Sequence, residues 1–264
     1  MSEDDLLVER PTGMAWLLDI LRTWGPALLA VLLIRTYVFE PFRIPSGSMV
    51  PTLQIGDHVV VNKMSYGLWV PYIVVEIPFM ELAWVVPRFE LIDFGDPERG
   101  DIIVFRYPKN ESLNYIKRVV AVPGDRIEVR NNQIFLNGEA QDRTYIDRYS
   151  FADDRCNEMK TKRYVETLAG VEHQVLTNAG VPGHLSTMRE IVVPEDSVFV
   201  MGDNRDNSED SRRWKFVRYD QIKGKAHFVW FSWTSCPSPT VRSDRFFENL
   251  YTMPDLSPAK APAP

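Results

Sequence analysis

The chain has 264 residues, of which 45% are hydrophobic and 25% charged, enough apolar material for a packed core in one large or two small domains. This composition excludes an intrinsically disordered protein. The net charge of -6 and the isoelectric point near 5.4 give no support for a nucleic-acid partner, which favours a strongly basic surface.

The first predicted element is a mostly apolar segment from Met14 to Phe39, interrupted by Asp19, Arg22 and Arg35. Its longest uncharged stretch, residues 23–34, is only twelve residues long, whereas a spanning helix needs about twenty. A buried or interfacial helix is therefore an alternative. A single membrane span is favoured because the arginines can snorkel and because aromatic residues suited to membrane interfaces stand at Trp16, Trp24, Tyr37 and Phe39.

The tail before this segment, residues 1–13, contains Glu3, Asp4, Asp5 and Glu9. A cleaved signal peptide would begin with a basic region instead, so we expect the apolar segment to be retained as an anchor. Arginines are balanced on its two sides, so the charge pattern does not decide its orientation in a membrane.

A second apolar region, residues 68–86, is interrupted by Pro71, Pro78, Glu76 and Glu81, which argues against another span. We expect either a strand-and-loop surface that touches lipid or ordinary core strands.

The rest of the chain alternates short β-rich runs with turn residues, which predicts a mainly β fold with little helix beyond the anchor. The predicted strands lie at Val59–Val61, Asp101–Phe105, Tyr115–Val122, Arg126–Val129, Ile134–Leu136, Ile191–Phe199 and Lys225–Trp233. Residues 137–189 are more polar and poorly patterned, and we assign them no catalytic role. Residues 254–264 are rich in Pro and Ala and are predicted to be disordered.

A Ser-Gly-Ser-Met motif follows the apolar segment, with Ser48 as its second serine, and Lys117 stands about seventy residues later in an apolar run. Side chains alternate on a strand, so Lys117 shares a face with apolar neighbours. Burial there would lower its pKa from about 10.4 toward neutrality, and a neutral lysine can take the proton of a serine hydroxyl without histidine. The structural alternatives are a plain Ser-Gly-Ser turn and a lysine that extends to water.

Five motifs in chain order strengthen the catalytic interpretation, namely Pro45–Leu53, Arg99–Asp101, Tyr115–Arg118, Pro123–Asp125 and Gly202–Arg212. Together they resemble the bacterial type I signal peptidases, from the apolar segment to about Phe231. The resemblance implies a coiled antiparallel β-sheet catalytic domain behind one transmembrane helix. The implied parts are a cytoplasmic tail at 1–13, the anchor at 14–39, an extracytoplasmic catalytic domain at 40–253 with a variable subdomain at about 137–190, and the tail at 254–264.

The resemblance also implies roles for individual residues. Ser48 is the expected nucleophile and Lys117 the general base, while the Ser46 hydroxyl and the Ser48 N–H form the oxyanion hole. Ser208 is expected to orient the lysine, and Gly202 to keep space clear beside it.

A structural ion-pair network of Arg118, Asp210 and Arg212 is expected to hold the Gly202–Arg212 loop against the Lys117 strand. Calcium binding by the acidic residues of this loop is not expected, because Arg205 occupies the third position counted from Asp203. We predict neither a metal nor a cofactor.

The substrate implied by the resemblance is a signal peptide with a small-x-small cleavage site, bound as an added strand at an exposed sheet edge. Shallow apolar pockets that admit alanine are expected at Phe42, Ile44, Pro45, Leu53, Tyr115 and Ile116. Signal peptidases of this type hold their catalytic domain on the outer face of the bacterial cytoplasmic (inner) membrane. The implied partners are therefore exported preproteins, membrane lipid and the secretion translocon, with no nucleic acid.

The two cysteines, Cys156 and Cys236, lack metal-ligand spacing and are too few for a disulfide scaffold. The sequence leaves open whether they pair or remain two free thiols. The histidines also show no metal-binding spacing, at His58, His173, His184 and His227.

Three other functions compete with this interpretation. Self-cleaving repressors also use a Ser-Lys pair but have DNA-binding domains and no anchor, so the apolar segment argues against them. A specialised peptidase that trims one secreted protein differs only in substrate range, which the sequence does not reveal. A membrane-anchored module that binds secreted proteins without cutting them would not need both Ser48 and Lys117.

Overall fold

The computed structural model describes residues 13–70, 73–77, 82–86 and 89–253. The chain divides into two compact units, Met1–Phe39 and Glu40–Pro264. The predicted tails at 1–13 and 254–264 lie outside the described residues, apart from Gly13.

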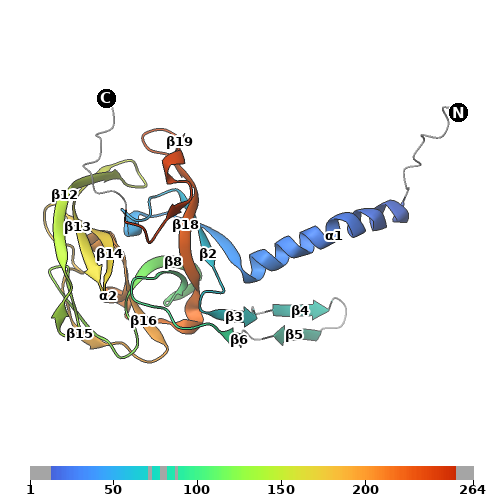
Figure 1. Cartoon of the computed structure of the whole chain (residues 1–264), viewed down its shortest axis with the longest axis horizontal. Helices are drawn as coiled ribbons and strands as arrows, with labels where there is room; N and C mark the ends of the chain where they lie inside the picture. The colour runs from blue at the N-terminus through green and yellow to red at the C-terminus, as the bar shows by residue number, and fades with distance from the viewer. Residues whose placement is uncertain (1–12, 71–72, 78–81, 87–88, 254–264) are drawn as a thin grey trace. The chain divides into compact units, whose positions relative to one another are not determined.

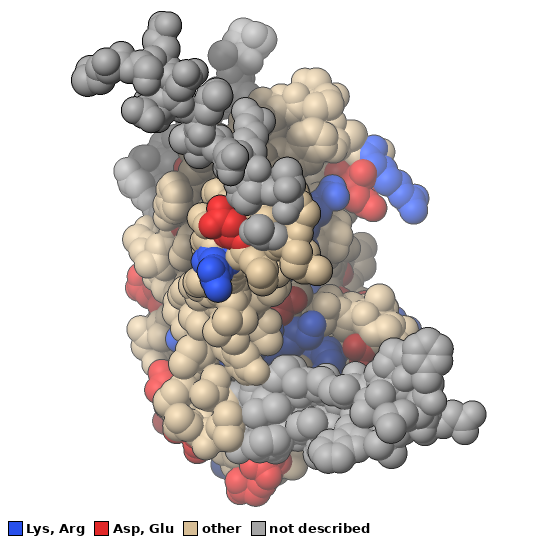
Figure 2. Space-filling view, turned by 90° about the vertical axis from the view of Figure 1, so that its right-hand side faces the viewer, with Lys and Arg blue, Asp and Glu red and all other residues tan. Residues whose placement is uncertain are grey.

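The first unit is built on the helix α1, Met14–Tyr37, in which the segment Trp16–Tyr37 has a mean hydropathy of 1.8 and is long and apolar enough to cross a membrane. Its leucines and tryptophans are mostly exposed, as a lipid-facing helix requires. In the view of the whole chain in Figure 2, most of the described atoms belong to uncharged residues, which are drawn in tan. The helix ends at Tyr37, and Phe39, the last residue of the predicted anchor, begins strand β1 instead.

The second unit contains one nine-stranded sheet, whose path runs β1-β2-β18-β7-β8-β16-β17, with β19 and β20 also paired to β18 (Figure 1). Its strands are β1 (Phe39–Arg43), β2 (Asp57–Asn62), β7 (Ile102–Tyr107), β8 (Asn110–Ala121), β16 (Ser197–Met201), β17 (Val217–Arg218), β18 (Ile222–Thr234), β19 (Thr240–Val241) and β20 (Glu248–Asn249). The registered neighbours are antiparallel. The mainly β, antiparallel fold class predicted from the sequence is therefore confirmed.

Two smaller sheets occupy the segment predicted to be poorly patterned, together with strands on either side of it. One has the order β11-β10-β9-β15 and the other β12-β13-β14. Their strands are β9 (Arg126–Arg130), β10 (Gln133–Leu136), β11 (Glu139–Ala140), β12 (Arg143–Ala152), β13 (Glu158–Leu168), β14 (Val171–Asn178) and β15 (Met188–Val192). The single strand predicted over Ile191–Phe199 is wrong, because β15 and β16 are separate strands of different sheets.

The apolar region after β2 forms two-stranded ribbons (Figure 1). Strand β3 (Gly67–Val70) pairs with β6 (Phe89–Asp93), and β4 (Ile73–Ile77) pairs with β5 (Leu82–Val86). Within the described backbone these ribbons are separate from the nine-stranded sheet, so they are not strands of the main sheet.

Alternation on β2 illustrates how the core is formed. Asp57, Val59 and Val61 are buried while the residues between them are half-exposed, as expected for a strand with one face on the core. The two valines pack in a cluster with Ile44, Met49 and Leu53, which belong to the loop around the candidate nucleophile. Apolar contacts in the core therefore hold that loop against the sheet.

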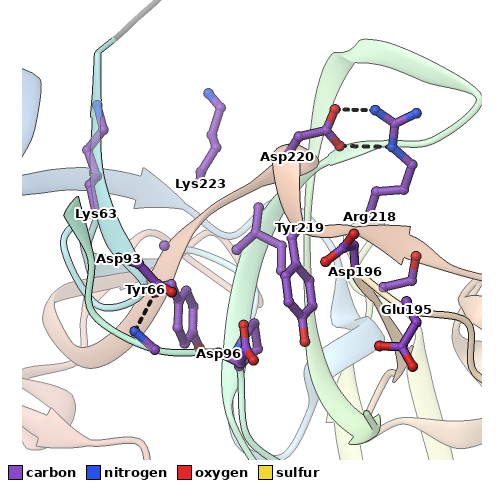
Figure 3. Close-up of a pocket in the computed structure, with 15 residues that line it drawn as sticks. Lys63, Tyr66, Asp93, Asp96, Glu195, Asp196, Arg218, Tyr219, Asp220 and Lys223 are labelled. Carbon is purple, nitrogen blue, oxygen red and sulfur yellow. Dashed lines mark hydrogen bonds and ion pairs between the residues drawn. The ribbon is translucent and has the colours of Figure 1, made fainter. Parts of the chain in front are cut away.

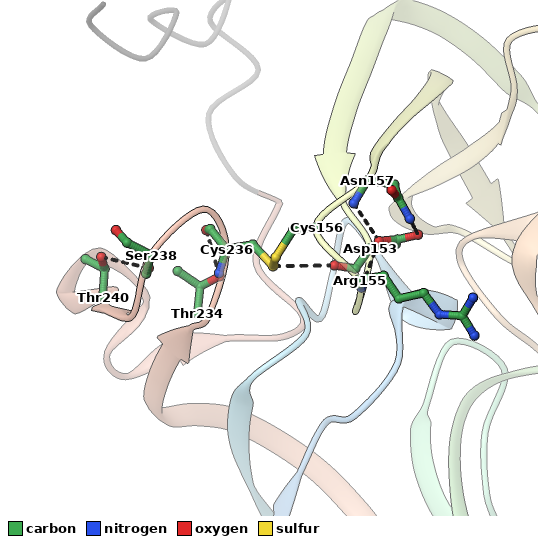
Figure 4. Close-up of a disulfide and its surroundings, with 8 residues drawn as sticks. All are labelled: Asp153, Arg155, Cys156, Asn157, Thr234, Cys236, Ser238 and Thr240. Carbon is green, nitrogen blue, oxygen red and sulfur yellow. Dashed lines mark hydrogen bonds between the residues drawn. A yellow bond between two sulfur atoms is a disulfide. The ribbon is translucent and has the colours of Figure 1, made fainter.

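Short helices complete the second unit: η2 (Gly47–Met49), η3 (Arg205–Asn207), α2 (Ser211–Trp214), η4 (Tyr219–Gln221) and η5 (Ser243–Arg245). A disulfide joins Cys156, in the turn between β12 and β13, to Cys236, just after β18 (Figure 4). Its presence answers the question that the sequence left open.

Candidate active site

Ser48 lies in the 3₁₀ helix η2, where the first backbone N–H groups have no acceptor inside the helix. Asn204 holds this turn from the opposite loop. Its N–H donates to the Ser48 carbonyl at 3.1 Å, and its side-chain amide donates to the Gly47 carbonyl at 3.0 Å. The Ser46 hydroxyl oxygen is 3.5 Å from the Ser48 hydroxyl oxygen, so the two hydroxyl groups are neighbours in the site.

Lys117 reaches Ser48 from strand β8. Its Nζ atom lies 2.7 Å from Ser48 Oγ and 3.0 Å from the carbonyl oxygen of Ile116, and only 4% of the residue is exposed. This distance is within the range of a direct proton transfer between the two groups. The structure thus brings together the two residues predicted as nucleophile and base.

Burial lowers the pKa of Lys117 to about 8, because an ammonium group loses its hydration there. The carboxylates of Asp210 and Asp203 act in the opposite direction, and the guanidinium of Arg212 adds to the lowering. A lysine with this pKa is partly neutral near physiological pH, as a general base must be.

The buried arginine Arg118, next to Lys117, pairs with Asp203. The guanidinium makes two hydrogen bonds to the carboxylate, at 2.9 and 2.7 Å, and a third to the Gly100 carbonyl at 2.9 Å. Thr52 also donates to Asp203, at 2.5 Å. Burial alone would raise the pKa of Asp203, but Arg118 outweighs it and holds the pKa below its usual range.

The second ion pair joins Asp210 and Arg212 within one turn. Two nitrogens of Arg212 each donate to Asp210 at 2.8 Å, and the Gly202 N–H donates to the same carboxylate at 3.1 Å. The single network predicted for Arg118, Asp210 and Arg212 therefore needs correction. Arg118 pairs with Asp203 instead, because Asp210 caps α2 and takes its arginine from that helix.

Two further contacts of this loop were missed in the sequence. Arg205 forms a fully buried pair with Glu166 of β13, and Asp206 accepts the N–H groups of Asn178 and Gly183, each at 2.8 Å. All three partners lie in residues 137–189, the segment that was expected to have no catalytic role, and no local sequence pattern indicated these contacts. The acidic residues of the loop are thus occupied by protein contacts.

Gly202 and Ser208 lie together behind the nucleophile. A Cβ atom on Gly202 would overlap the Ser208 hydroxyl and the Ser48 carbonyl, so the glycine makes room for these two groups; that it also keeps space clear beside Lys117 stays a prediction. Burial alone would raise the pKa of Asp210, but Arg212, the Gly202 N–H and the buried Ser208 hydroxyl outweigh it and hold this pKa below its usual range. The lysine-orienting role of Ser208 remains a prediction, since the second partner of Nζ is the Ile116 carbonyl.

A cleft of about 470 Å³ opens over Ser48 and Lys117. Pro45, Tyr115 and Ile116, three of the predicted substrate-binding residues, line it. Ile44 and Leu53 are buried in the core cluster and Phe42 packs against it, so these three are not among the lining residues. Phe151, Asp153 and Asp154 of the β12–β13 turn line the cleft and were not predicted.

A separate hollow of about 620 Å³ lies where β18 begins (Figure 3). Lys63, Tyr66, Asp96, Arg218 and Tyr219 are among its lining residues, and none of the predicted site residues is. Its charged groups are of mixed sign, and Arg218 is paired with Asp220. Because no predicted site residue lines this hollow, we do not take it as the candidate active site despite its volume.

The sequence matches the family model "Signal peptidase, peptidase S26" over residues 17–233. It is 36% identical to signal peptidase I of Pseudomonas fluorescens and 34% identical to that of Pseudomonas aeruginosa, covering 90% of this chain and 80% of each relative. Signal peptidase I of Aquifex aeolicus is 35% identical over 78% of this chain and 80% of its own length.

A solved signal peptidase I from Enterococcus faecalis is 26% identical, covers 49% of this chain and 96% of its own, and superposes with a TM-score of 0.32. The family match spans most of the chain, and the three relatives are similar over at least 78% of it. The resemblance inferred from the motifs is confirmed: the chain belongs to the bacterial type I signal peptidases of the peptidase S26 family.

Proposed function

We propose that this signal peptidase cleaves exported preproteins after small-x-small sites, with Ser48 as nucleophile and neutral Lys117 as general base. The observation that carries the proposal is the 2.7 Å distance between Lys117 Nζ and Ser48 Oγ at a buried lysine whose pKa is lowered to about 8. No histidine is needed, because the lysine can hold and return the proton.

In the acylation step the Ser48 oxygen attacks the scissile carbonyl while Lys117 takes the hydroxyl proton. The Ser46 hydroxyl and the Ser48 N–H donate to the negative oxygen that develops. Lys117 then gives its proton to the leaving amine, which departs as the new N-terminus of the mature protein. A water molecule, deprotonated by the again neutral Lys117, hydrolyses the acyl-enzyme and releases the signal peptide.

The substrate binds as an added strand along β8. The segment from Asn114 to Lys117 lines the cleft and pairs with β7 on one side, whereas the pairing with β16 begins only at Arg118. The free side of this segment offers backbone groups to an extended peptide. Pro45 and Ile116 line the cleft beside this segment, and we expect them to form shallow apolar pockets that accept alanine.

The apolar helix α1 anchors the enzyme in the bacterial cytoplasmic membrane, with the N-terminus in the cytoplasm and the catalytic unit on the outer face. Signal peptides emerge at this surface after translocation, so the membrane lipid and the secretion translocon are the expected surroundings. The β3–β6 and β4–β5 ribbons are the part of the catalytic unit that we expect to touch lipid.

The test incubates the detergent-solubilised full chain with a preprotein that carries an Ala-x-Ala site and locates the cut by mass spectrometry. Cleavage after the second alanine by the wild type, lost in Ser48→Ala, is the expected result. Cleavage by folded Ser48→Ala protein would contradict the assignment. A folded wild type that cuts only one native secreted protein would indicate a specialised peptidase instead.

A further inference from the structure

The tip of the β12–β13 hairpin lies against the loop of the candidate nucleophile. A Cβ atom on Gly47, the residue before Ser48, would lie 3.1 Å from the ring carbon Cε2 of Phe151, so the ring packs on the glycine backbone. Phe151 is half-buried and lines the cleft over Ser48 together with Pro45 and Ile55. An aromatic ring thus forms a wall beside the reacting centre.

The cleft does not end at this ring. An adjoining hollow of about 630 Å³ shares five lining residues with it, Pro45, Ile55, Phe151, Asp153 and Asp154. The second hollow continues past Tyr149 toward Cys236. A peptide that passes Ser48 and extends into this groove must cross the hairpin tip at Phe151.

Covalent and hydrogen-bonded contacts fix the tip in this place (Figure 4). The Asp153 carboxylate accepts the N–H groups of Arg155 and Asn157 at 2.9 and 2.8 Å, which closes the turn. The disulfide from Cys156 to Cys236 then ties the turn to the end of β18, in a different sheet. The position of Phe151 relative to Ser48 therefore depends on a cross-link between two sheets.

We propose that Phe151 is a specificity-determining residue, whose ring contacts a substrate side chain near the scissile bond and limits its size, and that the Cys156–Cys236 disulfide holds the ring there. This inference rests on the proposed function of Ser48 and Lys117. A rigid apolar wall rejects a larger side chain because the extra volume has no room, and each methylene is worth about 10- to 200-fold in selectivity.

The test compares preproteins that carry alanine, valine, leucine or phenylalanine, one position at a time, from three residues before the cut to two after it. Pairs of substrates compete in one reaction, so the ratio of their kcat/KM values does not depend on how much enzyme is folded. In Phe151→Ala the ratio of bulky to alanine substrate should rise about tenfold at one or two positions. Tyr145→Ala, on the same hairpin and 52% exposed, is the matched control and should leave every ratio unchanged.

A double Cys156→Ser, Cys236→Ser variant should raise the same ratios at the same positions, and a thiol reductant should do so in the wild type but not in that variant. Unchanged ratios in Phe151→Ala would overturn the specificity role. Unchanged ratios in the cysteine variant would overturn the role of the disulfide. Loss of all cleavage in Ser48→Ala tests the proposed function separately, because that result does not depend on the ratios.

Discussion

Lys117 and Arg118 are neighbours on β8, both almost fully buried, but they lie in different electrostatic surroundings. Arg118, 2% exposed, has a carboxylate of its own in Asp203, with which it forms a bidentate pair. Lys117, 4% exposed, has a serine hydroxyl and a backbone carbonyl as partners instead. Its pKa is lowered to about 8.

The comparison shows how one loop serves both cations. Asp203 and Asp210 would each favour a charged lysine, but Arg118 and Arg212 already neutralise them. The cost of burying the ammonium group then outweighs the remaining attraction. The ion pairs of the Gly202–Arg212 loop therefore allow the pKa of Lys117 to fall, and they also hold the loop in place.

The largest effect is expected when Lys117 is replaced by a permanent cation, so that positions 117 and 118 both carry arginine. Lys117→Arg should lower kcat/KM by about 100- to 10,000-fold, because a guanidinium cannot accept the Ser48 proton. The rate of preprotein cleavage measures this loss. Since arginine and lysine are both long cations, circular dichroism should show a folded protein. Near-normal cleavage by this variant would mean that Lys117 is not the base.

Removing the other cation tests the structural half of the contrast. Arg118→Met leaves Asp203 buried without its partner, and we expect the free energy of unfolding to fall by about 3–5 kcal/mol. Denaturant unfolding of the catalytic unit measures the change. Arg130→Met, which removes a pair exposed to solvent, is the matched control and should leave the free energy of unfolding nearly unchanged. Equal losses in the two variants would show that the buried pair has no special weight.

The finest test shifts the balance of charge around Lys117 in two directions. Asp203→Asn removes a group that raises the pKa of Lys117, so the midpoint of the kcat/KM profile should move to lower pH. Arg212→Gln removes a group that lowers this pKa, so the midpoint should move to higher pH. Unfolded protein is inactive and lowers the height of the kcat/KM profile, but it does not move the midpoint, which reports the folded enzyme alone. Shifts of the same sign in both variants would refute the electrostatic account.

The sequence predicted that Ser48 and Lys117 share a site, where the structure places them 2.7 Å apart, and it predicted the strands β2, β7, β8 and β18 of the main sheet, because apolar runs and ordered motifs are local signals. It did not predict that Arg118 pairs with Asp203. The two residues are far apart in the chain, and the sequence does not show which distant residues become neighbours in the fold. The sequence also did not predict the two strands of the β12–β13 hairpin. Its strands are only partly buried, so charged residues interrupt the alternation that would mark a strand with one face on the core.

The protonation of Lys117 tests the central claim most directly. The full chain in detergent, with Nζ-labelled lysine and Lys117→Arg protein for assignment, can be titrated by NMR from pH 6 to 11. The account predicts a midpoint near 8 for Lys117, well below the value of about 10.4 for a solvated lysine. A midpoint at or above 10 would mean that the ammonium form persists at the site and that Lys117 cannot serve as the resting base.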